Sequence, residues 1–464
     1  MIAIEEIRQK LQSILGSDGV LSGSDAVAPY LYDCSLPYFR AEATHECVVA
    51  QPENAEQISE IMKYANEKLI PVVVRGGGTG LCGAAIVTHP GIVISMERLD
   101  SIIEVDEKNF IITVESGVTL KQLNDYLHEH VPNMTFGSQP CDENAQIGGM
   151  VCENSGGIRT EGNSTTRSNV RGIEVVLPTG EITLFNGKMK RNNAGYDLMQ
   201  LMIGSEGTLG IVTKIMLSVR PKLPCDATII AAFDNYSQAA DAVTMSLKTG
   251  IHLDGIEYMD RSTAKKCAAN TGKTWPLNKG KVDLMFIVCA ENEESAFNIC
   301  QMVESICSMA GAVESRTYDG ADKQKEFIEM RTTSLFATQN NMAETMDIAV
   351  PPAEVPRLMK VFHEISEKYN IVTDTVGHIS EGNVHNNVYA EKDGSLPAKY
   401  HEMRDELYRA AIDMGGTISG EHGIGKRKRE ELRMQLDDIQ VQLMRKIKNA
   451  FDPNNILNPD TAII

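Results

Sequence analysis

Two short polar stretches contain most of the side chains in this sequence that could do chemistry together. One holds His378 and His385, and the other holds Glu421 and His422. Both are rich in glycine, so the main chain can come close to a bound ion or ligand. Two histidines and one carboxylate with open positions fit a catalytic divalent metal such as zinc or ferrous iron better than a fully ligated structural metal. The His-x6-His spacing has low specificity and also fits a polar loop with structural histidines.

A β-hairpin would bring the two histidines of the first stretch together. Residues 371–376 are rich in β-branched side chains, residues 384–389 resume an extended pattern, and Glu381-Gly-Asn383 between them has turn chemistry. On a single strand, positions seven apart lie on opposite faces. Folding the chain back at the turn instead makes His378 and His385 diagonal neighbours on two strands. The sequence therefore predicts two convergent imidazoles.

Length and charge limit the classes of protein to consider. A chain of 464 residues is too long for one ordinary core, so two or three domains are expected. The 63 acidic and 44 basic residues give a net charge of −19, which argues against nucleic acid or an anionic membrane surface as a partner. An anionic substrate would then need local positive charge from a metal or an arginine.

The cysteines and the first residues bear on redox centres and location. None of the ten cysteines forms a Cys-x-x-Cys pair, so the spacings of iron–sulfur clusters and zinc knuckles are absent. The sequence opens on an amphipathic helical pattern rather than an export signal, and no apolar run approaches about 18 residues. We therefore expect a soluble, cytoplasmic protein with reduced thiols.

The first half contains three glycine clusters. The β-rich run 70–74 leads directly into Arg75-Gly-Gly-Gly-Thr-Gly80, and further clusters lie at 147–157 and 203–213. Backbone N–H groups in such loops can bind phosphate oxygens. The first cluster is neither a Walker loop nor a Rossmann fingerprint, because it lacks Gly-Lys-Ser/Thr and does not lead into an amphipathic helix. Each cluster alone also fits a tight turn, but together they predict three contacts with one extended ligand.

These motifs resemble a known flavoprotein superfamily. Arg75–Gly80, Gly148-Gly149 with Asn154–Gly157, and Gly195-Tyr-Asp-Leu followed by Gly204–Gly210 resemble the FAD domain of the vanillyl-alcohol oxidase and p-cresol methylhydroxylase superfamily. The two histidine stretches, with Phe451-Asp-Pro and Leu457-Asn-Pro, are similar to its FAD-linked D-2-hydroxyacid dehydrogenase branch. That branch includes glycolate oxidase FAD subunits, D-lactate dehydrogenases and D-2-hydroxyglutarate dehydrogenases. The resemblance spans nearly the whole chain.

The resemblance implies where FAD binds. It implies non-covalent attachment, because Thr79 stands where covalently flavinylated relatives often have histidine. The cofactor-binding residues that we expect on this basis are Arg75, Gly76, Gly77, Gly78, Thr79, Gly80, Gly83, Pro140, Gly148, Gly149, Asn154, Gly156, Gly157, Glu206, Gly210, Ile211 and Asn458.

The resemblance also implies an α+β architecture with a two-domain FAD-binding fold of the p-cresol methylhydroxylase type. The expected parts are an FAD-binding domain at 1–220, an α+β substrate or cap domain at 221–415, and a C-terminal segment at 416–464 that returns to the FAD domain. Periodicity predicts the individual elements. The predicted helices are 53–65, 119–127, 237–248, 294–309, 354–368 and 426–448, and the predicted strands are 72–74, 91–95, 111–115 and 282–288. Lys426–Arg429 would form a solvated helix face or a patch for docking a partner.

Roles for the histidine stretches follow from the same resemblance. It implies that His378, His385 and Glu421 bind one divalent metal that chelates the substrate's carboxylate and hydroxyl oxygens. His422 is then left as the base, and an imidazole suits that role near neutral pH. Asn383 would hydrogen-bond to the substrate or support a metal ligand.

The expected substrate is a small D-2-hydroxy acid. Arg331 matches the arginine that holds the substrate carboxylate in this branch, although a solvated helix arginine is the simpler interpretation. Where 2-hydroxyglutarate enzymes carry a lysine for a second carboxylate, this chain has Thr345-Met-Asp347. D-lactate is therefore the first choice and glycolate the second.

An external electron acceptor is expected, because the sequence has no haem motif, cysteine cluster or membrane segment. In this respect the chain resembles lactate dehydrogenase subunits that work with an electron-transfer flavoprotein. Quinone reduction and a separate iron–sulfur subunit are alternatives. Other classes are a metal hydrolase using the same histidines, which the glycine clusters argue against, and a non-catalytic FAD-holding subunit, which the complete histidine and glutamate set argues against.

Overall fold

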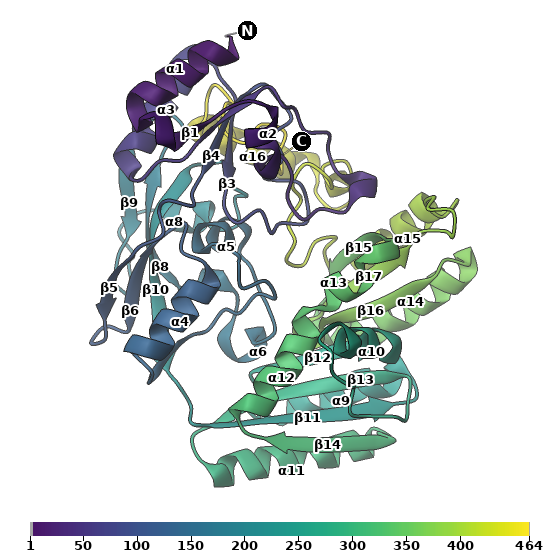
Figure 1. The fold of residues 1–464 in the computed structure, drawn as a ribbon. Helices are drawn as coiled ribbons and strands as arrows, with labels where there is room; N and C mark the ends of the chain where they lie inside the picture. The colour runs from purple at the N-terminus through teal and green to yellow at the C-terminus, as the bar shows by residue number, and fades with distance from the viewer. Residues whose placement is uncertain (1–2, 464) are drawn as a thin grey trace.

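The computed structural model describes residues 3–463. Figure 1 shows two parts: residues up to about 220, in purple to teal, build the first, and the green residues build the second. The yellow C-terminal segment lies against the first part, so the chain leaves that part and later returns to it.

The first part opens with a small sheet in the order β1-β2-β4-β3, in which β2, β4 and β3 run parallel. Helix α3 begins at the Asn54 cap and buries one face against this sheet, so the predicted helix 53–65 and strands 72–74 and 91–95 are confirmed. The bounds are α1 Ile4–Leu15, β1 Val20–Leu21, α2 Ser24–Val27, β2 Cys47–Ala50, α3 Ala55–Lys68, β3 Val72–Arg75 and β4 Gly91–Ser95.

A second, antiparallel sheet follows in the order β5-β6-β10-β8-β9, with β7 paired to β10. The predicted strand 111–115 is confirmed, and so is the helix after Thr119, which forms a capping box with Gln122. The bounds are β5 Ile102–Asp106, β6 Ile111–Glu115, α4 Leu120–His130, β7 Met134–Phe136, α5 Ile147–Glu153, α6 Thr160–Asn163, α7 Thr166–Asn169, β8 Val170–Val176, β9 Ile182–Asn186, α8 Leu198–Met202 and β10 Ile211–Pro221.

The second part is a seven-stranded antiparallel sheet in the order β14-β11-β13-β12-β16-β17-β15. The strands are β11 Cys225–Phe233, β12 Gly255–Asp260, β13 Val282–Ala290, β14 Glu314–Asp319, β15 Met342–Ala349, β16 Thr373–His378 and β17 Asn383–Tyr389. The helices are α9 Tyr236–Lys248, α10 Arg261–Asn270, α11 Glu293–Met309, α12 Ala321–Thr332, α13 Ser334–Thr338, α14 Val355–Tyr369 and α15 Tyr400–Asp413. The predicted elements 237–248, 282–288, 294–309 and 354–368 are thus confirmed within a residue or two at their ends.

Both faces of this sheet are covered, which explains why strands β11 and β13 are mostly apolar. Along β13, Leu284 and Phe286 pack into the core beneath α9, α11, α14 and α15, whereas Met285 and Ile287 pack into the core beneath α10 and α12. Alternate side chains of a strand point to opposite faces. The sheet is therefore the middle layer of three.

The predicted histidine hairpin is confirmed, and its register extends across four neighbouring strands. In β16 and β17, Val376 lies opposite His385, so His378, two residues further on, is diagonal to it. On the far sides, Glu257 of β12 pairs with His378 and Asp347 of β15 pairs with His385. Directly paired residues share a face of the sheet. Four strands thus place two imidazoles and two carboxylates in one row.

The C-terminal segment extends the first sheet. Val72 of β3 donates its N–H to the Ile456 carbonyl at 2.8 Å and accepts from the Asn458 N–H at 2.7 Å. Helix α16, Asp438–Phe451, precedes this segment, and the ammonium of its Lys448 donates to the Leu457 carbonyl at 2.8 Å. Backbone pairing and a buried cation therefore attach the segment to the first part.

The predicted helix 426–448 is wrong in its first half. The chain is irregular from Lys426 to Glu430, forms a short 3-10 turn, and enters a helix only at Asp438. Asp437 accepts the Gln440 N–H at 2.8 Å, and the Gln440 side chain accepts the Asp437 N–H at 3.0 Å. This capping box fixes the helix start, whereas the charged residues before it have helical periodicity without forming a helix.

The prediction of a solvated helix face at 426–429 is also wrong. Lys428 is 2% exposed and lies 3.9 Å from the Asp347 carboxylate. Lys426 donates to the Thr461 hydroxyl at 2.8 Å, and burial lowers its pKa to about 8. Buried cations need partners, so this stretch packs inside the molecule beside the histidine site instead of facing water.

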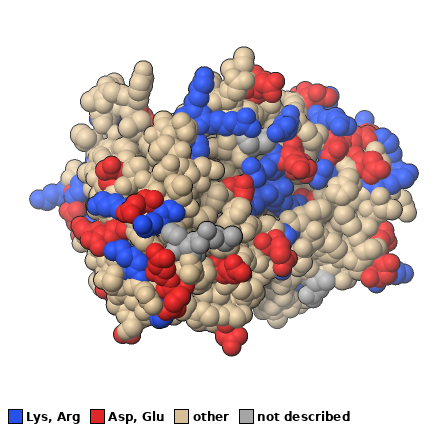
Figure 2. Space-filling model, turned by 90° about the horizontal axis from the view of Figure 1, so that it is seen from above, with Lys and Arg blue, Asp and Glu red and all other residues tan. Residues whose placement is uncertain are grey.

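The surface carries both signs of charge. On the face seen from above, Lys and Arg side chains gather near the middle, with acidic side chains around them (Figure 2). All ten cysteines are free, and within residues 3–463 we find no helix with the length and apolar character needed to cross a membrane.

The capping box of α16 gives a stability prediction. Asp437→Ala removes the acceptor of the Gln440 N–H and should cost about 1 kcal/mol, so that amides of α16 exchange with solvent about fivefold faster. Hydrogen exchange measured by mass spectrometry checks this. Asp438→Ala, one residue inside the helix and exposed, is the matched control, and equal acceleration in both variants would contradict the capping role.

Candidate active site

Three imidazoles converge on one carboxylate oxygen. The Nε2 atoms of His378, His385 and His422 lie 3.3, 3.2 and 3.8 Å from Glu421 Oε1. Ligand atoms of His378, His385 and Glu421 all lie within 4.8 Å of one another, as one metal ion requires. The structure thus brings together all four residues that the two polar stretches suggested.

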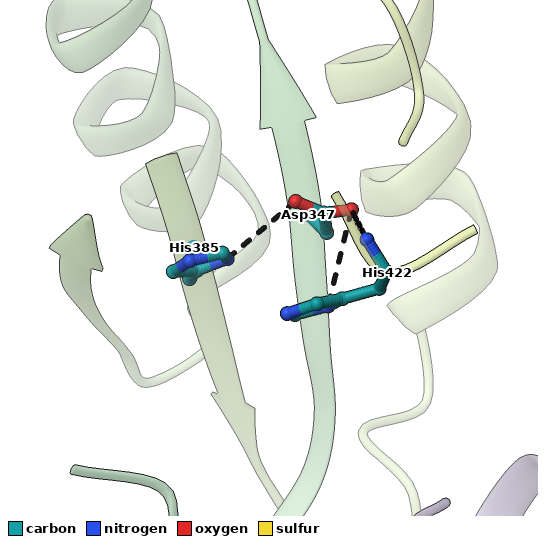
Figure 3. Close-up of side chains that lie close together, drawn as sticks. All are labelled: Asp347, His385 and His422. Atoms are coloured by element: carbon teal, nitrogen blue, oxygen red, sulfur yellow. Dashed lines mark hydrogen bonds and ion pairs between the residues drawn. The ribbon is translucent and has the colours of Figure 1, made fainter. Parts of the chain in front are cut away.

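A buried carboxylate lies behind each imidazole. His378 Nδ1 donates to Glu257 Oε1 at 2.7 Å. Asp347 faces the Nδ1 side of the other two rings, with its oxygens 3.6 Å from His385 Nδ1 and 3.9 Å from His422 Nδ1 (Figure 3). A carboxylate at Nδ1 leaves Nε2 free to act as ligand or base and fixes the ring orientation, as at many histidine metal sites.

Asp347 also holds the loop that carries the third imidazole. Its Oδ2 accepts the N–H groups of Glu421 at 3.0 Å and His422 at 2.8 Å, and the Ser419 hydroxyl at 3.0 Å. The rings of His385 and His422 stack with centroids 4.8 Å apart and an interplanar angle of 6°. One aspartate therefore holds the loop backbone by hydrogen bonds and faces both stacked rings (Figure 3).

Burial sets the protonation state of His422. It lowers the pKa of this imidazole to about 4, against the opposing effect of Asp347. The ring is neutral at pH 7, with Nδ1 facing a carboxylate and Nε2 facing the cavity side of Glu421. A neutral imidazole in this orientation can accept a proton.

Arg331 is not the solvated helix residue of the simpler interpretation. It is 2% exposed, its Nε lies 2.6 Å from Glu257 Oε2, and its Nη1 donates to the Ser334 hydroxyl at 3.1 Å. Within residues 3–463, Nη2 has no hydrogen-bond partner, and Arg331 lines the cavity described below. A buried guanidinium with one unsatisfied edge can bind a carboxylate.

Sequence reasoning missed Glu257 as a site residue and noted Asp347 only for its place beside Thr345. Each is an acidic residue inside an otherwise apolar strand, Ile256 to Met259 and Met346 to Val350. Aspartate and glutamate are almost never fully buried unless paired. A carboxylate in a continuous apolar run was therefore the available signal.

One large cavity contains the glycine clusters and reaches the histidine site. Beside Arg331, its lining includes His385, Glu421 and His422. The predicted cofactor residues that line it are Gly76, Gly77, Gly78, Thr79, Gly80, Pro140, Gly148, Gly149, Glu206, Gly210, Ile211 and Asn458. Residues from all three clusters thus face one space, together with the candidate catalytic groups.

Five predicted cofactor residues lie outside this lining: Arg75, Gly83, Asn154, Gly156 and Gly157. The guanidinium of Arg75 donates to the carbonyls of Pro29 and Tyr32, so it holds the preceding segment rather than facing the cavity. Asn154 ends α5 and accepts the Arg167 N–H at 2.9 Å. These residues shape the loops around the cavity.

Asn458 and Glu206 join three segments at the cavity wall. The Asn458 side chain accepts the Val74 N–H at 2.8 Å and donates to the Glu206 carbonyl at 3.0 Å. The Glu206 carboxylate accepts the N–H groups of Ile424 at 2.9 Å and Gly425 at 2.6 Å. The histidine loop is thus fastened to the glycine-rich part.

Asn383 and Gly382 shape the hairpin end. Asn383 pairs with His378 and lies so close to Gly420 that a Cβ there would be 2.5 Å from its Oδ1. Gly382 has φ of 83°, and a Cβ on it would lie 1.9 Å from the Val350 carbonyl. Only glycine fits that turn, which brings the hairpin end against the 419–425 loop.

The free space beside Gly149 shows that the cavity has room for a ligand close to the main chain. This glycine lies in helix α5 and lines the cavity, and a Cβ on it would meet no protein atom within 4 Å. Added side-chain atoms would therefore enter the cavity rather than the protein core. The main chain leaves room there for a group that approaches it closely.

The chain matches known protein families over the two parts that form the site. Residues 224–462 match the family model described as FAD linked oxidases, C-terminal domain, and residues 47–186 match that of an FAD binding domain. The second match contains the first two glycine clusters and the first contains the histidine stretches. The cavity, open at Gly149 and lined by glycines, fits FAD.

Full-length relatives point the same way. The chain is 35% identical to D-lactate dehydrogenase from Archaeoglobus fulgidus, over 96% of this chain and 97% of that protein. It is 31% identical to glycolate oxidase subunit GlcD from Bacillus subtilis, over 98% and 96%. The fold matches p-cresol methylhydroxylase with a TM-score of 0.78 at 18% identity, covering 100% of this chain and 97% of that structure. The expected two-domain fold is confirmed.

Gly149 gives a prediction for cofactor binding. Gly149→Val should weaken FAD binding about 5- to 150-fold, because overfilling a packed site costs about 1–3 kcal/mol. Visible flavin absorbance per purified chain measures this. The control is Gly187→Val, where a Cβ would meet only the tip of Met189, outside the cavity lining. Full FAD content in the Gly149 variant would contradict the assignment.

Proposed function

The chain belongs to the family of FAD-linked oxidases and is an FAD-linked 2-hydroxyacid dehydrogenase, and on that premise we propose that it oxidises a small D-2-hydroxy acid, D-lactate first, to the 2-oxo acid. The carrying observation is the convergence of His378, His385 and His422 on Glu421. Of these residues His385, Glu421 and His422 line the glycine-lined cavity together with Arg331. The relative from Archaeoglobus fulgidus is named D-lactate dehydrogenase, which supports this choice of substrate.

The chain's own residues supply binding and proton transfer. Arg331 binds the substrate carboxylate through its unpartnered Nη2 and orients the hydroxyl toward the histidines. His422 takes the hydroxyl proton on Nε2, and Asp347 stabilises the imidazolium from the Nδ1 side. FAD held by the glycine-lined wall would supply the acceptor for the substrate's Cα hydride. Asn383 packs against Gly420 in the loop that carries His422.

Charge favours a divalent metal at His378, His385 and Glu421. Within the described residues, the carboxylates of Glu257, Asp347 and Glu421 have ion pairs with the cations Arg331 and Lys428, so with all three histidines neutral the cluster would carry one net negative charge. Against the effect of burial, Glu257 and Glu421 raise the pKa of His378 well above its usual value, so this site favours a positive charge. A zinc or ferrous ion would reverse the net charge of the cluster to one positive charge, matching a substrate monoanion. Such an ion supplies Lewis acidity that lowers the pKa of a bound hydroxyl.

The cavity favours a small monocarboxylate. Of its described lining residues, Arg331 is the only lysine or arginine. Leu335, Phe336 and Val376 also line the cavity. So does Thr345, in the stretch Thr345-Met-Asp347 that this chain has where 2-hydroxyglutarate enzymes carry a lysine. A second substrate carboxylate would be buried without a cation, which is costly.

FAD is proposed to bind non-covalently, with Thr79 in the cavity wall. We assign the FAD-binding domain to 1–220, the cap to 221–415, and the returning segment that carries Glu421 and His422 to 416–464. Electrons then pass to a separate acceptor, with an electron-transfer flavoprotein as first choice, since the sequence holds no Cys-x-x-Cys pair or haem motif. A location in the cytoplasm is part of the proposal.

Anaerobic mixing with a panel of D- and L-2-hydroxy acids tests the function. D-lactate should bleach the flavin of the purified protein fastest, glycolate and D-2-hydroxyglutarate should react more slowly, and L-lactate should not react. Metal analysis of the same sample should find one divalent ion per chain, and a strong chelator should slow bleaching. The reduced flavin should be reoxidised by an electron-transfer flavoprotein and not by NAD.

Each alternative has its own result in that experiment. If glycolate or D-2-hydroxyglutarate bleached the flavin faster than D-lactate, that acid would be the substrate instead. If metal-free protein were active, the metal would have no role in the reaction. A yellow protein that no hydroxy acid bleaches would be a non-catalytic FAD-holding subunit.

The base assignment predicts a selective loss. His422→Ala should keep FAD and metal but lower the rate of flavin reduction by roughly 10²–10⁴-fold, the usual scale for removing a general base. Stopped-flow reduction with D-lactate measures this. His363→Ala is the control, since His363 is exposed on α14 and is not among the residues that line the cavity. An unchanged rate in the His422 variant would exclude it as the base.

A further inference from the structure

Glu257 divides its two carboxylate oxygens between two groups of different function. Oε1 accepts from His378 Nδ1 at 2.7 Å, and Oε2 lies 2.6 Å from Arg331 Nε. Within residues 3–463, Oε2 has no hydrogen-bond partner, so its contact with Arg331 is an ion pair.

We propose that Glu257 is a positioning residue that couples the metal site to the substrate-carboxylate site. The inference rests on the proposed function, because it takes His378 as a ligand and Arg331 as the anion anchor. Glu257 itself does not line the cavity. It therefore acts through these two side chains and not on the substrate.

Strand pairing places Glu257 for this role. It lies directly opposite His378 in the β12–β16 ladder, so the two side chains share one face of the sheet. Arg331 reaches the same carboxylate from helix α12, which packs on that face. All three side chains are at most 3% exposed. Water cannot replace either contact.

Each contact fixes the functional end of its partner. With Nδ1 bound to Glu257, His378 must present Nε2 to Glu421, 3.3 Å away. With Nε held by Glu257 and Nη1 bound to Ser334, Arg331 must present Nη2 to the cavity. A movement of the Glu257 carboxylate would therefore displace His378 Nε2 and Arg331 Nη2 together.

A neutral side chain of the same shape cannot satisfy both partners. Glutamine has one carbonyl oxygen and one NH₂ group, so it can accept from either His378 or Arg331 but would present a donor to the other. The guanidinium would also lose the buried carboxylate with which it forms an ion pair. Glu257→Gln should therefore loosen both groups while leaving the volume of the core unchanged.

Two measurements on the flavin-loaded protein test the coupling. After removal of bound metal with a chelator, titration with Zn²⁺ should give a dissociation constant about 10- to 100-fold higher in Glu257→Gln than in the wild type, the usual effect of losing the carboxylate behind a ligating histidine. The KM for D-lactate in metal-replete protein should rise by about tenfold or more through the loosened Arg331.

The matched control is Asp283→Asn. Asp283 is a fully buried carboxylate of the same sheet that pairs with Arg261 through both oxygens at 2.5 Å, outside the cavity lining. This control loses a buried carboxylate–arginine pair just as Glu257→Gln does. It should lower thermal stability as much but leave the Zn²⁺ dissociation constant and the KM within about twofold.

The outcomes separate this inference from the function on which it rests. Two results would overturn the proposed metal site itself: a wild-type protein that binds no Zn²⁺, or a His385→Ala variant that binds Zn²⁺ as tightly as the wild type. Wild-type binding with an unchanged Zn²⁺ constant or an unchanged KM in Glu257→Gln would overturn the coupling alone. Equal changes in the Asp283 variant would show a general loss of sheet stability and would also overturn it.

Discussion

The site depends on carboxylates placed behind imidazoles. A histidine can offer either ring nitrogen, and three of them crowded around one carboxylate would adopt several arrangements without a further constraint. Here Glu257 faces one Nδ1 and Asp347 faces two, so every Nε2 turns toward Glu421. Both carboxylates are fully buried and could not stay charged there without these partners. The carboxylates and the histidines thus need one another.

Sheet register produces this arrangement from residues far apart in the chain. Glu257, His378, His385 and Asp347 come from four neighbouring strands and share a face because their pairing positions match. A slip of one residue in any pairing would send a side chain to the opposite face, into an apolar core. The apolar residues between the polar ones fix the strand register and so keep the four polar side chains on the same face of the sheet. Glu421 and His422 join from a loop whose backbone is bound to Asp347.

Local sequence signals predicted the parts of the site that depend on neighbours in the chain. The hairpin was accessible because β-branched runs flank a turn, and the confirmed helices and strands follow from periodicity and caps. Glu257 was not accessible, because its role comes from pairing with a strand about 120 residues away. The helix predicted at 426–448 failed for a related reason: a run of basic residues looks like a solvated surface, whereas Lys428 is held inside by Asp347. Tertiary partners decide such positions, and the family resemblance supplied roles that spacing could not.

The return of the 456–458 segment to strand β3 has a consequence for the order of folding. The contact between Val74 and Asn458 spans 384 residues, so the loop-closure entropy of joining them is paid late. During synthesis the outer edge of β3 has no neighbour until the whole cap has emerged from the ribosome, and an open edge invites unwanted strand pairing. Asn458 also lines the cavity. The nascent glycine-rich half therefore lacks one wall of its dinucleotide site, and cofactor loading belongs to the final stage of biogenesis.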